Sequence, residues 1–193
     1  MTGEAGGDRG GEEQWWRGRE WWTQYEGVVF DLDGTLVRLA VDWDQVDEEL
    51  GALLDPTGVD PGVHEHWEQL DAAQEAGVGE EAETIITEHE LAGAEGSRRL
   101  PLADRLPEID RPVGVVSLNA EAPVTRALEI HGLLDQVDVV VGRDSVPERK
   151  PAPEPLFAAL AALGVAPDSA LFVGDSAGDE ETARRAGVCF KWV

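Results

Sequence analysis

The sequence predicts an α/β protein, built on a doubly wound, Rossmann-like parallel sheet with a small α-helical cap inserted after the first strand. From residue 27 onward, short and continuously apolar runs alternate with amphipathic segments, which is typical of a parallel sheet covered by helices on both faces. One long helical stretch, residues 41–97, interrupts this alternation after the first apolar run. A length of 193 residues suits one domain that carries such an insert.

The alternating segments define the predicted elements of the sheet domain. The predicted strands are residues 27–30, 113–118, 137–142, 170–175 and 188–192. The predicted helices between them are residues 122–134, 153–164 and 179–187. Gly164 and Gly187 stand at the ends of two of these helices, where a glycine commonly closes the last turn.

The inserted stretch contains three helical patterns and no convincing strand. They cover residues 43–55, 61–77 and 79–96, and each has one apolar stripe, such as Trp67 and Leu70 at i and i+3. His64 and His66 form a His-x-His pair, but their rings point apart on a helix. We therefore expect these histidines and His89 to be solvated or packed, and not to bind metal.

The domain organisation follows from these patterns. We predict an irregular leader over residues 1–25, an α/β core over residues 26–40 and 98–193, and a helical cap over residues 41–97. The leader holds four of the seven tryptophans, in two doubled pairs at positions 15–16 and 21–22. These aromatics either pack onto the domain, which we slightly favour, or form a homodimer contact, so that a monomer and a homodimer both stay open.

The charge balance restricts the classes of partner. The chain has 40 acidic and 15 basic residues, a formal net charge of −25. Nucleic acid and anionic membranes are repelled by such a field, so we exclude both as partners. Acidic residues spread along the whole chain are typical of a halophilic protein, whose surface charges are screened by salt.

Targeting and redox features are few. No apolar run is long enough to span a bilayer, and the N-terminus lacks the pattern of a secretion signal, so we expect a cytoplasmic protein. The single cysteine, Cys189, excludes an internal disulfide. It lies in an apolar terminal run, and we expect it to be a small buried core residue.

Polar side chains follow several of the predicted strands. In doubly wound sheets, ligands bind beyond the carboxyl ends of the strands. The residues placed there are Asp31, Asp33, Ser117, Asp175 and Asp179, together with Lys150 before a predicted helix. Four carboxylates in one crevice require a cation, and Mg²⁺ paired with a substrate phosphate is the usual solution. Lys150 and Ser117 could then hold phosphoryl oxygens.

Four stretches of the chain resemble the sequence motifs of a known family. "FDLDGTLV", "VVSLN", "RKPAPEP" and "VGDSAGDEETARRAG" are similar, in order and spacing, to motifs one to four of the haloacid dehalogenase superfamily. The resemblance covers nearly all of residues 26–190. The helical insert resembles the small cap of the phosphoglycolate phosphatase-like members, which closes over the substrate.

The resemblance implies a mechanism: hydrolysis of a small-molecule phosphate monoester through an aspartyl phosphate. Asp31 would be the nucleophile, and Asp33 the general acid that protonates the leaving alcohol and then activates water. The resemblance also implies that Mg²⁺ is held by the side chains of Asp31 and Asp175 and by the main-chain carbonyl of Asp33. The expected partner is a small phosphorylated metabolite.

The same resemblance implies supporting roles. Ser117 and Lys150 would grip the phosphoryl oxygens, and Gly34 would let the backbone approach the phosphate closely. Asp179 would hold Lys150 or a metal-bound water. Thr35 and Asn119 complete the set, although the family often places Asn directly after the Ser, and here Leu118 intervenes.

One alternative enzymatic function and one non-enzymatic function stay open. A phosphomutase could pass the same phosphoryl group back to a sugar, and a regulatory protein could keep the fold and bind phosphate without turnover. Two other classes of the superfamily are disfavoured. A dehalogenase does not need Asp33, and a phosphonatase-type enzyme would need a lysine in the cap, whereas residues 41–97 contain none. A substrate that carries a carboxylate usually needs a cationic partner, and only Arg98 and Arg99 lie near the ends of the insert.

Overall fold

A five-stranded parallel sheet forms the centre of the computed structural model, which describes residues 15–18, 20–59 and 66–193. Its strand order is β5-β4-β1-β6-β7, and every neighbouring pair is parallel. The strands are β1 (Gly27–Phe30), β4 (Val113–Val116), β5 (Val139–Val141), β6 (Ala170–Gly174) and β7 (Cys189–Trp192). All five predicted strands are therefore present.

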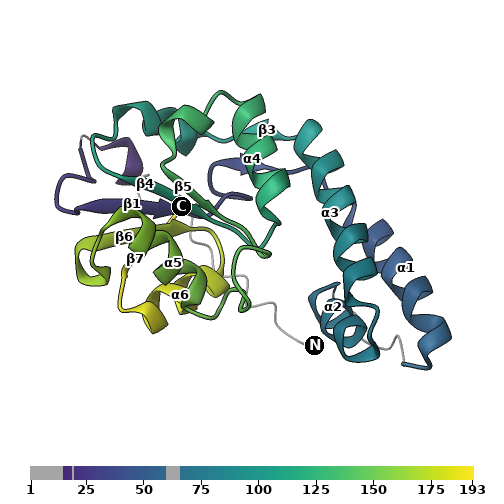
Figure 1. The fold of residues 1–193 in the computed structure, drawn as a ribbon. Helices are drawn as coiled ribbons and strands as arrows, with labels where there is room; N and C mark the ends of the chain where they lie inside the picture. The colour runs from purple at the N-terminus through teal and green to yellow at the C-terminus, as the bar shows by residue number, and fades with distance from the viewer. Residues whose placement is uncertain (1–14, 19, 60–65) are drawn as a thin grey trace, which may run out of the picture.

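Helices cover both faces of this sheet (Figure 1). Val28 and Phe30 of β1 pack in one apolar core with helix α4 (Glu121–Ile130), and Val29 packs in another core with α5 (Glu154–Leu163) and α6 (Ala177–Ala186). Successive side chains of a strand point to opposite faces, so a continuously apolar strand needs a core on each side. This arrangement confirms the doubly wound α/β fold.

Glycines end the two helices of the second face, as expected. Gly164 and Gly187 adopt left-handed φ angles of 69° and 71° at the ends of α5 and α6. Helix α6 begins earlier than predicted, at Ala177, because Ser176 and Asp179 cap its N-terminus reciprocally: each side chain accepts a hydrogen bond from the other's backbone N–H. This cap fixes Asp179 at the carboxyl edge of the sheet.

The segment inserted after β1 folds as three helices, α1 (Trp43–Leu54), α2 (His66–Ala76) and α3 (Gly79–Glu95). They extend beside the sheet domain (Figure 1) and share an apolar core that includes Val46, Leu50, Leu70 and Ile86. A short 3₁₀ turn, η2 (Asp55–Thr57), follows α1. His64 lies outside the described residues, and the proposed bounds of core and cap stay a prediction.

A small antiparallel pair at the base of the insert was not predicted. Strands β2 (Val37–Arg38) and β3 (Arg98–Arg99) pair Val37 with Arg99, and so tie together the two connections between the sheet domain and the helices. Two residues are too few for a period to be visible in a sequence. Four further 3₁₀ segments are η1 (Trp15–Arg17), η3 (Pro101–Glu108), η4 (Leu134–Gln136) and η5 (Pro167–Ser169).

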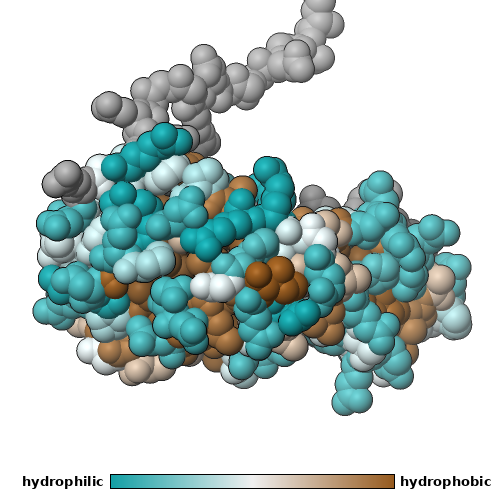
Figure 2. All heavy atoms as spheres, turned by 90° about the horizontal axis from the view of Figure 1, so that it is seen from above, coloured by the Kyte–Doolittle hydropathy of each residue, from teal (hydrophilic) through white to brown (hydrophobic). Residues whose placement is uncertain are grey.

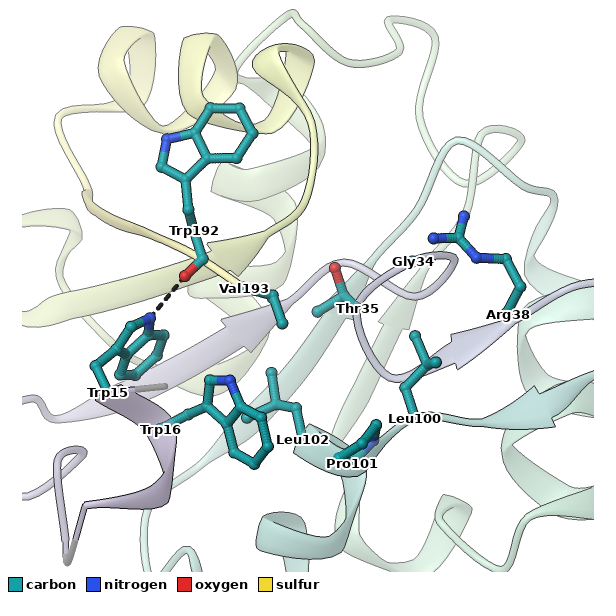
Figure 3. Close-up of a pocket in the computed structure, with 10 residues that line it drawn as sticks. All are labelled: Trp15, Trp16, Gly34, Thr35, Arg38, Leu100, Pro101, Leu102, Trp192 and Val193. Carbon is teal, nitrogen blue, oxygen red and sulfur yellow. Dashed lines mark hydrogen bonds between the residues drawn. The ribbon is translucent and has the colours of Figure 1, made fainter. Parts of the chain in front are cut away.

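The tryptophan-rich segment packs onto its own chain. Trp16 and Trp22 belong to the same core as β1 and α4, and they are only 6% and 2% exposed. Trp15 donates a 2.6 Å hydrogen bond from Nε1 to the carbonyl oxygen of Trp192 (Figure 3). The described part of the leader therefore matches the first of the two interpretations, while residues 1–14 and Arg19 lie outside the described residues.

The expectation for Cys189 is wrong, because its side chain is exposed. It lies on β7, the last strand in the sheet order, which has a neighbouring strand on only one side among the described residues. Its Sγ lies 3.3 Å from the hydroxyl oxygen of Tyr25. A terminal apolar run therefore predicted the strand correctly but not the burial of this residue.

Figure 2 shows hydrophilic residues spread over the visible face of the molecule, with hydrophobic areas between them. Among the described residues, none of the helices is both long enough and apolar enough to cross a bilayer.

Candidate functional site

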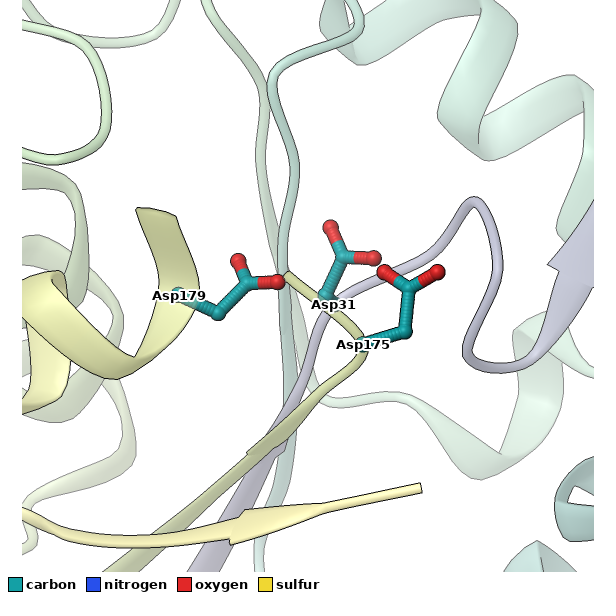
Figure 4. Close-up of side chains that lie close together, drawn as sticks. All are labelled: Asp31, Asp175 and Asp179. Atoms are coloured by element: carbon teal, nitrogen blue, oxygen red, sulfur yellow. The ribbon is translucent and has the colours of Figure 1, made fainter. Parts of the chain in front are cut away.

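Three carboxylates meet at the carboxyl edge of the sheet. Asp31 directly follows β1, Asp175 directly follows the neighbouring strand β6, and Asp179 lies in the first turn of α6. Each offers one oxygen atom such that the three atoms lie within 4.8 Å of one another. Figure 4 shows the three side chains pointing toward one another, with Asp31 between the other two. The strand-end positions predicted from the sequence are therefore brought together.

Lys150 lies against this cluster. Its buried Nζ donates hydrogen bonds to Oδ1 of Asp31 at 2.7 Å, to Oδ1 of Asp179 at 2.6 Å and to the carbonyl oxygen of Val116 at 3.1 Å. An ammonium group has three protons, so all three are used. Burial alone would lower the pKa of Lys150, but the charges of Asp31 and Asp179 outweigh it and raise that pKa. The lysine is therefore held in its charged form.

Asp31 is a buried acid of the cluster, with 5% of its surface exposed. Its Oδ1 accepts from Lys150, and its Oδ2 accepts a 3.3 Å hydrogen bond from the hydroxyl of Thr35, which is fully buried. Burial raises the pKa of Asp31 to about 7, and the charge of Lys150 opposes this shift. Both oxygens are thus oriented by hydrogen-bond donors, and Thr35 is the donor to Oδ2.

Asp33 sits two residues further on, in a more open position. Its Oδ1 accepts a 2.9 Å hydrogen bond from the backbone N–H of Leu39 and lies 3.7 Å from Nη1 of Arg38. Partial burial raises the pKa of Asp33 above its usual value, against the influence of these two donors. Its side chain is 27% exposed and lines the same cavity as Asp31. A carboxyl group in this setting is suited to exchanging protons with a bound molecule.

The backbone at position 34 requires a glycine. Its φ angle is +89°, and a Cβ added there would collide with the carboxylate of Asp175. Only glycine combines that backbone conformation with such a close approach. The turn after β1 therefore packs directly against Asp175, whose other neighbour is Arg38, with Nη2 3.7 Å from Oδ2.

Ser117 and Asn119 form a small loop after β4. The hydroxyl of Ser117 donates to Oδ1 of Asn119 at 3.1 Å and accepts from the backbone N–H of Asn119, also at 3.1 Å. The amide nitrogen of Asn119 donates to Oε1 of Glu90 at 2.9 Å. Both predicted residues line the cavity that contains Asp31, but the carboxamide of Asn119 is engaged with helix α3 of the insert.

Glu90 and Arg143 are central to the structure and were missed from the sequence. Glu90 of α3 is fully buried, and its carboxylate accepts from Asn119, from the backbone N–H of Ala120 and from Nη1 of Arg143 at 2.7 Å. Arg143 also binds Glu83 of the same helix. Arg143 follows the end of β5 by two residues. The search for polar residues just beyond the carboxyl ends of strands, which identified Ser117, could therefore also have identified Arg143. No sequence signal marks Glu90 as buried.

The inserted helices also complete the cavity over the acid cluster. This cavity has a volume of about 190 Å³, and its wall on the insert side consists of Trp43, His66 and Trp67. The rings of Trp43 and His66 are stacked, with centroids 4.1 Å apart, and the ring of Trp67 lies 4.7 Å from that of His66. His66 thus packs on an aromatic ring, as expected, but beside the site.

A second cavity, of about 300 Å³, adjoins the loop after β1 (Figure 3). Gly34, Thr35 and Arg38 line it from that loop, and Trp15 and Trp16 line it from the leader. Its walls contain none of the acids of the cluster. The groups suited to bind a cation and a phosphate therefore lie in the smaller cavity and not here.

The donor set of the cluster fits a magnesium ion. Mg²⁺ prefers oxygen ligands, and the described cluster consists of three carboxylates. Burial and the charge of Asp179 raise the pKa of Asp175, which is the effect of crowded anions that a cation would relieve. Asp179 accepts hydrogen bonds from Lys150 and Ser176, and Asp31 accepts them from Lys150 and Thr35, so each of these two acids would offer an ion its remaining lone pairs.

Comparisons with known proteins agree with one another. Residues 70–193 match the family model described as haloacid dehalogenase-like hydrolase. A phosphoglycolate phosphatase of Rhodospirillum rubrum is 36% identical over 186 residues, which cover 84% of this chain and 77% of that protein. A phosphoglycolate phosphatase of Cereibacter sphaeroides is 36% identical over 187 residues, which cover 85% of this chain and 83% of that protein.

Solved structures are similar over the same extent. The structure of a candidate phosphoglycolate phosphatase from Lactobacillus plantarum aligns with a TM-score of 0.63 at 26% identity, and covers 88% of this chain and 86% of that one. The structure of CbbY from Rhodobacter sphaeroides in complex with phosphate aligns with a TM-score of 0.64 at 21% identity, and covers 87% and 85%. At that identity the second likeness concerns the fold alone.

Proposed function

The chain belongs to the haloacid dehalogenase-like hydrolases, and from this premise we propose that it is a phosphatase that hydrolyses a small phosphate monoester through a phosphorylated Asp31. One observation carries the proposal. The buried Asp31 carboxylate lies 2.7 Å from the Lys150 ammonium, at the floor of a cavity that Asp33 and Asp175 also line. A nucleophile, a proton carrier and a cation therefore share one small space.

The first half of the proposed reaction transfers the phosphoryl group to the protein. A carboxylate oxygen of Asp31 attacks phosphorus, a bond forms between them, and the bond from phosphorus to the ester oxygen breaks. Asp33 gives its proton to that oxygen, so the leaving group departs as an alcohol. Lys150 favours the ionised form of Asp31 and orients its carboxylate, and its charge lies beside the phosphoryl oxygens.

The second half restores the enzyme. Asp33, now a carboxylate, takes a proton from a water molecule, whose oxygen attacks phosphorus and releases inorganic phosphate from Asp31. Ser117 lies beside the same cavity, where its hydroxyl can donate to a phosphoryl oxygen. Gly34 keeps the turn after β1 free of a side chain that would displace Asp175.

We propose Mg²⁺ as the cofactor, held by Asp31 and Asp175 and, by resemblance to the family, by the main-chain carbonyl of Asp33. Bound there, the ion supplies positive charge that offsets the crowded carboxylates and the phosphate. Phosphoglycolate, on which the named relatives act according to their names, is one substrate to test.

The test is a panel of phosphate monoesters assayed with and without Mg²⁺ in molar salt. We expect hydrolysis that requires the added ion and that disappears in the Asp31→Asn variant, with the circular dichroism spectrum unchanged. A retained rate in that variant would show that another group carries the reaction. Absence of turnover on every ester would instead favour a regulatory protein that binds phosphate.

A further inference from the structure

The wall of the active-site cavity that the insert supplies is aromatic and carries no fixed cation. Trp43 stands at the first position of α1, and His66 and Trp67 stand at the first positions of α2, so three rings face the acid cluster from two helix starts. The centroids of Trp43 and Trp67 are 5.9 Å apart. Indole rings offer large apolar faces and one N–H each, and they form favourable contacts with apolar groups.

The charges around the cavity are unfavourable for a second anion. Residues 41–97 contain no lysine and no arginine. Lys150 is the only lysine or arginine among the described residues that line the cavity, and Asp31 and Asp179 already engage it. A carboxylate on the leaving group would therefore lie near several acids without a cationic partner, which is costly at short range.

Neighbouring cations are committed elsewhere. The guanidinium of Arg143 lies 5.2 Å from the ring centroid of Trp67, but it is held by Glu83 and Glu90. Arg149 donates to Asp71 at 2.6 Å. Arg143 and Arg149 line an adjoining surface pocket and not the cavity over Asp31. Arg38 lies 3.7 Å from carboxylate oxygens of Asp33 and Asp175, and it lines the second cavity and not this one.

His66 completes the described part of this wall. Its Nδ1 lies 3.6 Å from Oδ1 of Asp47, a carboxylate on α1. The carboxylate of Asp47 therefore adds a negative charge beside this part of the wall. The cavity volume of about 190 Å³ is below the roughly 300–1,000 Å³ of pockets for drug-sized ligands, so the ligand is small.

We propose that Trp43 and Trp67 form the leaving-group subsite, and that this subsite accepts a small uncharged alcohol with an apolar body in preference to one that bears a carboxylate. The inference rests on the proposed phosphatase activity. The proposed preference differs from the activity for which the relatives are named, since hydrolysis of phosphoglycolate releases an alcohol that bears a carboxylate. The phosphoryl group binds at the acid cluster, and the rest of the ester lies against the two indoles.

The test compares three esters that all release a primary alcohol: benzyl phosphate, ethyl phosphate and phosphoglycolate. We expect kcat/KM for benzyl phosphate to exceed that for phosphoglycolate about tenfold or more, the scale of one good aromatic contact. Equal or faster turnover of phosphoglycolate would overturn the proposal. This comparison uses the unaltered protein, so it does not depend on the folding of a variant.

A second comparison assigns the effect to the subsite. Trp43→Leu should lower the ratio of kcat/KM for benzyl phosphate to that for ethyl phosphate about tenfold. Phe157→Leu, a change on the exposed surface of α5, should leave that ratio unaltered. An unaltered ratio in Trp43→Leu would overturn the role of Trp43, because both substrates share the same chemistry at phosphorus.

Binding separates this inference from the proposed function. Calorimetric titration of Asp31→Asn with benzyl phosphate and with phosphoglycolate measures the subsite without turnover. Tighter binding of benzyl phosphate supports the subsite even if the unaltered protein hydrolyses none of the esters, a result that would reject the phosphatase activity alone. Tighter binding of phosphoglycolate overturns the inference and leaves the phosphatase activity standing.

Discussion

The carboxylate of Glu90, on helix α3 of the insert, accepts a 2.9 Å hydrogen bond from the side-chain amide of Asn119, which follows strand β4 of the sheet domain. Asn119 in turn binds the hydroxyl of Ser117 at the rim of the active-site cavity. A fully buried acid of the insert is therefore connected through one residue to a predicted phosphate ligand. The position of the insert and the shape of the site are linked by this contact.

Removal of Glu90 should be strongly destabilising. Glu90→Ala leaves Asn119, the backbone N–H of Ala120 and part of Arg143 without their acceptor, and breaking a buried ion pair from one side costs about 3–5 kcal/mol. Urea unfolding measures this loss. Glu83→Ala is the matched control, because Glu83 binds the same arginine but is 34% exposed, and its loss should cost about 1 kcal/mol. Equal losses in the two variants would contradict the special role of Glu90.

Gly34→Ala should impair activity more than stability. The new Cβ would meet the Asp175 carboxylate and displace a proposed metal ligand, and a displacement of about 1 Å can cost about 100-fold in rate. Gly164→Ala is the control, since Gly164 also has a left-handed φ angle, of 69°, but an added Cβ there meets no atom within 4 Å. The control should lose stability alone. Steady-state kinetics and thermal melts separate the two effects, and full activity in Gly34→Ala would contradict the placement of Asp175.

Asp33→Asn should slow turnover severely, by about 100- to 10,000-fold, the usual contribution of a general acid–base. An asparagine keeps an oxygen that can accept from the N–H of Leu39, so the loop should stay in place, but its amide cannot transfer the proton. The kcat on an alkyl phosphate reports the loss. Retention of more than about a tenth of the activity would mean that the proton comes from another group.

The melting midpoint should rise with salt. With a net charge of −25, the folded chain is destabilised by repulsion between carboxylates, and the screening length falls from about 30 Å at 0.01 M salt to about 3 Å at 1 M. Thermal melts in dilute buffer and in molar KCl test this. Sucrose at equal osmolality is the control, because it favours burial without screening charge. A midpoint that KCl raises no more than sucrose does would remove the argument for halophily.

Much of the fold was readable from the sequence because its signals are local. Continuous apolar runs predict all five sheet strands, and the position of ligand sites at the carboxyl ends of parallel strands predicts that Asp31, Asp175 and Lys150 lie together. Contacts between distant segments were not readable. The hydrogen bond between Glu90 and Asn119 joins residues that are 29 positions apart and lie on different elements. Glutamates are usually exposed, and the residues around Glu90 in the sequence do not indicate that this one is buried.

The aromatic wall of the cavity illustrates the same limit. Trp43 and Trp67 fit the apolar stripes of their helices, and a stripe predicts packing within the insert. Both do pack against its core, yet both also face the acid cluster across the boundary to the sheet domain. Which side of a partly buried ring faces the cavity depends on how the inserted helices pack against the sheet domain. That packing is a property of the tertiary structure.

The central claim is that the phosphoryl group passes to Asp31. Acid quenching during turnover with Mg²⁺, followed by mass spectrometry of proteolytic peptides, measures it directly. The account predicts a phosphoryl group on the peptide that contains Asp31, lost when the substrate is exhausted and absent in Asp31→Asn. Rapid turnover with that peptide unmodified throughout, or a phosphoryl group on a different residue, would contradict it.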